Sequence, residues 1–163
     1  MTSFQQSALP TPAFLDTHRQ DELDALFASL SATSAAELNG NYEGRLIGIL
    51  GLSGLPKLAK GLTYGMLGTW INPWRGKQFM QTSGANQWGI GRHTSSWGEY
   101  SISESSDNAS LMLDYNVAAN PKLLRPILGE VRQLSNGLWL ARMRYRTKDD
   151  IKTLLYFTLR EVH

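Results

Sequence analysis

From residue 76 onward the sequence is a succession of short segments in which apolar and polar side chains alternate, with turn-forming residues between them. A period of two residues is that of a β-strand with one buried face, and short, evenly spaced segments of this kind are typical of antiparallel sheets. With one earlier segment they give eight expected strands. These are residues 41–50, 77–82, 87–91, 97–103, 110–115, 127–134, 138–146 and 153–162.

The residues between these segments support the same class of fold. Asn136-Gly137 predicts a tight hairpin turn, and Lys148-Asp149-Asp150 predicts another. Asn120-Pro121 predicts a helical turn over 122–124. No internal repeat or parallel-sheet rhythm is present, so we expect a mainly β chain, either an antiparallel sandwich or an up-and-down barrel of about eight strands. An eight-stranded barrel is just wide enough to be filled by side chains or to hold one small ligand.

The length of 163 residues fits one domain. Residues 1–17, which include Pro10 and Pro12, predict a flexible tail, and residues 18–163 predict the single folded domain. At its start, apolar side chains recur at the helical spacing i, i+3, i+4, i+7, which predicts an amphipathic helix over 18–31. They are Leu23, Leu26, Phe27 and Leu30.

Residues 51–70 interrupt the strands with five glycines, two lysines and no acid. A membrane span is excluded because Lys57 and Lys60 would lie near the bilayer centre. A stripe that includes Leu58 and Leu62 predicts a short helix over 55–66. We expect this helix to be a lid over the barrel mouth with its leucines facing a ligand; docking on an anionic membrane is the alternative.

Charge is unevenly distributed although the net charge is only +2. Between Glu43 and Glu99 the chain has six bases and no acid, which favours an anionic partner, although a solvated surface is the plain alternative. The small net charge and the lack of a nucleic-acid recognition motif argue against nucleic acid as a partner. The absence of cysteine and the scatter of His18, His93 and His163 predict no metal site and no cofactor. Because the N-terminus has no secretory signal, we expect a cytoplasmic protein. We also expect a monomer or a homodimer.

Residues 40–44 read Gly-Asn-Tyr-Glu-Gly at the start of the first strand. They resemble the Gly-x-Trp opening of lipocalin-like (calycin) barrels and, more narrowly, a Gly-x-Trp-x-Gly pattern of bacterial proteins of unassigned function, with Tyr42 in place of the tryptophan. The Trp-x-Gly-Lys element at residues 74–77 and the run 113–146 are similar to that group as well. The resemblance covers about residues 38–162. It implies a lipocalin-like barrel in which Arg160, on the last strand, packs over Tyr42.

The candidate ligand-binding residues follow from these elements. Trp70 and Trp74 would lie at the barrel mouth after the lid, although large aromatic residues in small barrels are more often core. In the strand 138–146, Arg142, Arg144 and Arg146 share one face. Either that face lines a wet cavity and binds an anionic head group, or it is an outward, solvated ladder. The full set is Tyr42, Leu58, Leu62, Trp70, Trp74, Lys77 and Arg144.

Residues suited to catalysis are few. Asp114 follows apolar residues in a strand and could act as a general base if it points inward, whereas a strand-end aspartate more often bonds the following turn. His93 is the other candidate, in a loop. We therefore expect a protein that binds a small hydrophobic or amphipathic, anionic ligand. An isomerase, cyclase or hydrolyase on the same barrel is the alternative, and a peripheral membrane-docking protein is the third.

Overall fold

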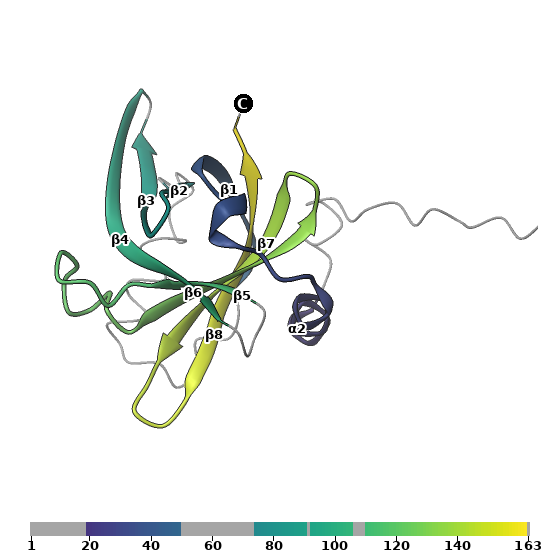
Figure 1. The fold of residues 1–163 in the computed structure, drawn as a ribbon. Helices are drawn as coiled ribbons and strands as arrows, with labels where there is room; N and C mark the ends of the chain where they lie inside the picture. The colour runs from purple at the N-terminus through teal and green to yellow at the C-terminus, as the bar shows by residue number, and fades with distance from the viewer. Residues whose placement is uncertain (1–18, 50–73, 91, 106–109, 163) are drawn as a thin grey trace, which may run out of the picture.

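The computed structural model describes residues 19–49, 74–90, 92–105 and 110–162 (Figure 1). Eight antiparallel strands form a closed barrel in which each strand pairs with the next and β1 pairs with β8. The expected eight-stranded antiparallel sheet is confirmed, and it is closed. The strands are β1 (Gly40–Ile49), β2 (Trp74–Phe79), β3 (Ser83–Ile90), β4 (His93–Ser105), β5 (Ser110–Asp114), β6 (Ile127–Ser135), β7 (Leu138–Arg146) and β8 (Ile151–Glu161).

The pairing of β1 with β2 brings Tyr42 and Lys77 together. Tyr42 is the direct partner of Lys77, and Glu43 is the partner of Gly76. Gly76 has φ +147°, and a Cβ atom there would lie 1.9 Å from the carbonyl oxygen of Tyr42. Only glycine allows the two strands to approach this closely. The neighbouring Lys77 is thereby held against β1 with its side chain on the inner face.

The helix α2 (Gln20–Ser29) lies outside the barrel (Figure 1). Leu23 and Phe27 are buried in a cluster that includes Leu138, Leu140 and Tyr156 of the barrel's outer surface. The expected helix over 18–31 is therefore present but shorter. The Glu22 carboxylate accepts a hydrogen bond from the Arg19 backbone N–H and so stabilises the first turn.

Beyond the helix, a short 3-10 turn, η1 (Ala35–Glu37), leads into β1. The expected helical turn at 122–124 is only a hydrogen-bonded turn, in which the Leu124 N–H donates to the Pro121 carbonyl. At the expected hairpin, Gly137 has φ +72°, as the tight turn between β6 and β7 requires.

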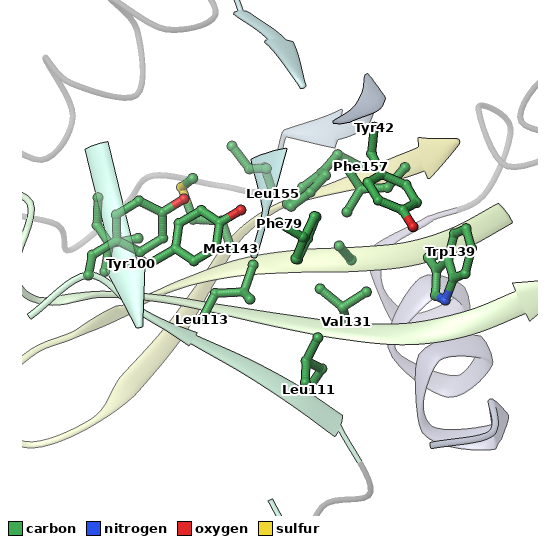
Figure 2. Packing of buried hydrophobic residues seen from close by; sticks show 14 of the residues in the cluster. Tyr42, Phe79, Tyr100, Leu111, Leu113, Val131, Trp139, Met143, Leu155 and Phe157 are labelled. Carbon is green, nitrogen blue, oxygen red and sulfur yellow. The ribbon is translucent and has the colours of Figure 1, made fainter. Parts of the chain in front are cut away.

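The barrel interior is the main core, with buried rings and aliphatic side chains (Figure 2), and the partly buried Trp88 of β3 packs against it. Tyr42 meets Phe79 and Trp139 edge to face, with ring centroids 5.3 Å apart in both pairs. On β7, Trp139, Ala141, Met143 and Tyr145 alternate into this core. The strand period of two therefore decides which side chains can reach a ligand inside the barrel.

Several expectations lie outside the described residues. They are the flexible tail over 1–17, the helical lid over 55–66 with Leu58 and Leu62, and Trp70. Within the described ranges, no helix is long and apolar enough to cross a membrane.

Candidate functional site

Lys77 lies inside the barrel and is only 1% exposed. On β2 the exposed Arg75 points outward, while the buried Lys77 and Phe79 point inward. A register shift between Trp74 and Gly76 breaks the alternation between Arg75 and Lys77. The cross-strand partners of Lys77 are Tyr42 on β1 and Asn86 on β3. Lysine is among the residues least often fully buried, because its charged form loses hydration. The contacts of its nitrogen atom therefore decide whether this buried lysine can carry a charge.

The Lys77 Nζ atom meets two oxygen atoms. It donates to Asn86 Oδ1 at 2.7 Å and to the Tyr115 hydroxyl at 2.5 Å. The Tyr115 hydroxyl in turn donates to Asn86 Oδ1 at 3.2 Å, and Trp74 Nε1 donates to the same oxygen at 3.4 Å. We call these four residues, Lys77, Trp74, Asn86 and Tyr115, the Lys77 cluster. Its oxygen atoms belong to an amide and a phenol, and neither carries a formal charge.

Aromatic rings surround the same nitrogen. Nζ lies 4.8 Å from the ring centre of Tyr100, 5.2 Å from that of Tyr115 and 5.5 Å from that of Phe157. Such rings give a cation partial compensation for lost water. Among the described residues, no carboxylate lies within ion-pair distance of Lys77. Burial consequently lowers the pKa of Lys77 to about 7.

The phenols of the site behave in the opposite way. Burial raises the pKa of Tyr115 and that of Tyr100, because the charged form of a phenol also loses hydration. The Tyr100 hydroxyl donates to the Gln78 carbonyl at 2.8 Å. Both phenols are therefore neutral at neutral pH, and Lys77 is the group in this site that can change its charge there.

The hydrogen-bond count at Nζ limits what the nitrogen can do. A protonated lysine has three N–H donors, and within the described part of the chain two of them have acceptors. The third N–H of the ammonium form would thus be available to a ligand oxygen. In the neutral form the two N–H groups are both satisfied, and a lone pair takes the third position.

Two glycines make room for the Lys77 cluster. A Cβ atom on Gly44 would lie 2.2 Å from the six-membered ring of Trp74, and one on Gly98 would lie 2.9 Å from Asn86 Nδ2. Asn86 Nδ2 donates to the Gly98 carbonyl at 3.4 Å, which fixes the amide with its oxygen toward Lys77. Glycine at positions 44 and 98 therefore leaves the space that the side chains of Trp74 and Asn86 occupy.

A groove of about 560 Å³ adjoins this part of the barrel. Its lining combines exposed side chains such as Glu43, Arg75 and Thr94 with Tyr42 and Trp74. Trp74 also packs edge to face on Phe157, at 5.3 Å between ring centroids. Trp74 belongs to the Lys77 cluster and also lines the groove, so its indole connects the two.

Of the predicted ligand residues, Tyr42, Trp74 and Lys77 are brought together by the structure. Trp74 is 7% exposed and packs in the core, as the plainer interpretation of the large aromatic residues expects, but it also lines the groove, so its role in ligand binding stays a prediction. The expected packing of Arg160 over Tyr42 is wrong. Tyr42 pairs with Glu161 in the sheet, and the exposed Arg160, opposite Glu43, lies on the other face of β8 from the inward Leu159.

The arginine face of β7 lies outside the barrel, so the interpretation in which it lines the cavity is wrong. Arg142 Nε and Arg144 Nη1 donate to the two carboxylate oxygens of Glu130, the latter at 2.9 Å. Glu130 is 1% exposed and pairs with Arg142 across β6 and β7. Arg142 also lies 3.9 Å from Asp24 of α2. The arginines thus satisfy a buried carboxylate beneath the helix, and a ligand role for Arg144 could only be on the outer surface.

The two catalytic candidates lie outside the barrel interior. Asp114 accepts a hydrogen bond from the Asn116 N–H at 2.9 Å and lies 3.9 Å from Arg146, so it is the strand-end aspartate of the plainer interpretation. His93 is an exposed residue at the first position of β4. Neither reaches the Lys77 cluster, and no cluster of three or more potential metal ligands occurs among the residues with a described position.

Sequence reasoning missed Asn86 and Tyr115. Tyr115 had a usable signal, because it continues the inward alternation of Leu111 and Leu113. Asn86 had no such signal, because residues 83–86 are small or polar and do not predict a strand. Its inward position becomes visible only once β3 is paired with β2.

Comparison with known proteins supports the fold. No family model and no curated protein matches the chain. A crystal structure of a protein from Thermomonospora curvata is similar to this chain over 93% of both chains, with a TM-score of 0.60 and 17% sequence identity. At that identity the likeness shows a shared fold alone, an eight-stranded antiparallel barrel that is compatible with ligand binding.

Proposed function

We propose that this protein is a lipocalin-like binding protein that holds a small amphipathic carboxylate in its barrel, with the carboxylate at Lys77. The observation that carries the proposal is a buried lysine whose third N–H has no acceptor among the described residues. A ligand carboxylate at that position would supply the missing acceptor and the missing negative charge together. A charged hydrogen bond of this kind contributes about 1.5–3 kcal/mol.

The rest of the ligand would be apolar. The interior around the cluster consists of rings and aliphatic side chains, including the cross-strand partners Met143 and Leu155. Methionine side chains adapt to irregular apolar shapes, so Met143 is suited to accommodate a tail. The groove beside Trp74 provides a surface from which a ligand could reach the cluster if the indole moves.

Binding of an anion at Lys77 would take up a proton. The pKa of about 7 leaves Lys77 partly neutral at neutral pH, and a bound carboxylate favours the charged form. Isothermal titration of decanoate in two buffers with different ionisation enthalpies tests this. We expect binding with a net uptake of protons at pH 7.5. Saturable binding without proton uptake would place the carboxylate elsewhere.

Lys77→Met tests the residue itself, because methionine fills a similar volume without the amine. Decanoate affinity should fall about tenfold or more, which corresponds to the loss of one charged hydrogen bond. Lys122→Met is the matched control, since Lys122 is an exposed lysine in the turn before β6. Equal affinity in both variants and the wild type would refute the proposal.

A further inference from the structure

The Lys77 nitrogen has a geometry that anion binding does not require. Its two hydrogen bonds, to Asn86 and Tyr115, use both hydrogens of a neutral amine. The lone pair then occupies the third position, the same one that would face a ligand. A nucleophilic amine needs a free electron pair that faces the reactant, and acceptors that hold both of its hydrogens orient the pair in this way.

We propose that Lys77 captures small aldehydes covalently, as an imine inside the barrel. The inference rests on the proposed ligand site, because the aldehyde's tail would take the same apolar interior. It does not rest on the ligand being anionic, so each idea can fail without the other.

The reaction needs no reagent beyond the aldehyde. The Nζ lone pair attacks the carbonyl carbon, a C–N bond forms, and the C=O π bond breaks toward oxygen. The nitrogen loses one proton and the oxygen gains one, which gives a carbinolamine. The C–O bond then breaks, the oxygen leaves as water with the second nitrogen proton, and the nitrogen lone pair completes the C=N bond.

Tyr115 is placed to pass these protons. Its hydroxyl accepts from Nζ at 2.5 Å and donates to Asn86 at 3.2 Å. It can receive a proton from the nitrogen and, once its O–H turns from Asn86 toward the aldehyde oxygen, give its own proton to that oxygen. Because burial raises the pKa of this phenol, it acts as a relay without becoming an anion. The 1% exposure of Lys77 also limits the access of water, which would reverse the imine.

The state of the amine separates Lys77 from the surface lysines. With its pKa lowered to about 7 by burial, a large share of Lys77 is neutral at pH 7. Exposed lysines are protonated there, with pKa values of about 10.4. Labelling of Lys77 should therefore exceed that of Lys122 more than about tenfold at pH 7, even after allowing for the lower intrinsic nucleophilicity of a weaker base.

Trapping of decanal with cyanoborohydride in the wild-type protein tests the inference. Intact mass spectrometry should show one alkyl adduct, and peptide mapping should place it on Lys77. Lys77→Met should lose the adduct, and Lys122→Met should keep it. The labelling rate of Lys77 should rise with pH through about 7 as the amine deprotonates.

The outcomes distinguish the two proposals. Decanoate binding with decanal adducts spread over exposed lysines would overturn the imine and leave the binding proposal standing. An adduct on Lys77 without decanoate binding would support the imine and overturn the anionic ligand. Neither binding nor a Lys77 adduct would overturn both. Because the wild-type map decides these cases, the test does not depend on the folding of Lys77→Met.

Discussion

The Nζ atom of Lys77 lies 2.5 Å from the phenolic oxygen of Tyr115, a residue 38 positions away in the chain. The buried amine thus faces a phenol rather than a carboxylate. A carboxylate would hold the lysine permanently charged, as it does in buried ion pairs. A neutral phenol leaves the charge of Lys77 free to respond to pH and to a ligand, and this property underlies both proposals above.

The stability of the protein should increase as the pH rises from about 7 to 10. Burial lowers the pKa of Lys77 to about 7 in the folded protein, whereas an unfolded lysine titrates at about 10.4. Between these values the unfolded chain binds one more proton, so raising the pH favours folding. The slope is at most about 1.4 kcal/mol per pH unit. Urea denaturation at several pH values measures it.

Lys77→Met should remove this pH dependence, because methionine does not titrate. Above pH 10 the effect should reverse even in the wild type, since burial raises the pKa of Tyr115 and Tyr100 while unfolded tyrosines begin to ionise. A wild-type stability that is flat or falling between pH 7 and 10 would show that Lys77 stays charged in the folded state.

Tyr115→Phe should destabilise the folded protein by about 1–3 kcal/mol at neutral pH, because Lys77 loses an acceptor and Asn86 loses a donor inside the core. Trapping of decanal should also slow if Tyr115 relays protons. Tyr145→Phe is a matched control, as Tyr145 is another buried core tyrosine, on β7. Denaturation and trapping rates that do not differ between these variants would exclude a special role for Tyr115.

The local pattern of the sequence was enough to predict the strands but not their inner faces. The alternation in 138–146 separates the arginines from Trp139, Met143 and Tyr145, and β7 has these same bounds. The arginine face of β7 points outward because Glu130, on the neighbouring strand β6, supplies a buried partner there for Arg142 and Arg144. Partners on separate strands come together only through sheet register, which no single segment encodes.

The candidate site shows the same limit. Lys77 was predicted as a ligand residue, but its partner Asn86 fell outside the predicted strand 87–91, because Ser83, Gly84 and Ala85 have weak strand propensity. In the structure β3 begins at Ser83, where Gly84 makes room for the ring of Tyr100. Tertiary packing therefore overrides local propensity at the place where the site forms.

Arg144→Leu should leave decanoate affinity unchanged, because Arg144 lies on the outer face with Glu130. Glu130→Gln should destabilise the protein by about 3 kcal/mol, near the lower end of the range for breaking a buried pair, since the arginines keep some solvent contact. Calorimetry of binding and urea denaturation separate the two readouts. A tenfold loss of affinity in Arg144→Leu would return the arginine face to the ligand site.

The close contact between Gly44 and Trp74 gives the last prediction. A Cβ atom on Gly44 would lie 2.2 Å from the six-membered ring of Trp74, so Gly44→Ala should displace the indole and break its bond to Asn86. Overpacking of this kind costs about 1–3 kcal/mol, and decanoate affinity should change with it. Gly89→Ala is the control, because the nearest atoms there belong to the flexible side chain of Arg75, 3.1 Å away.

A Trp74→Phe background tests whether the indole causes this cost. Phenylalanine lacks the outer ring atoms that cause the clash, so in this background Gly44→Ala should cost much less. Equal costs of Gly44→Ala in both backgrounds, measured as a double-mutant cycle, would show that the two residues act independently.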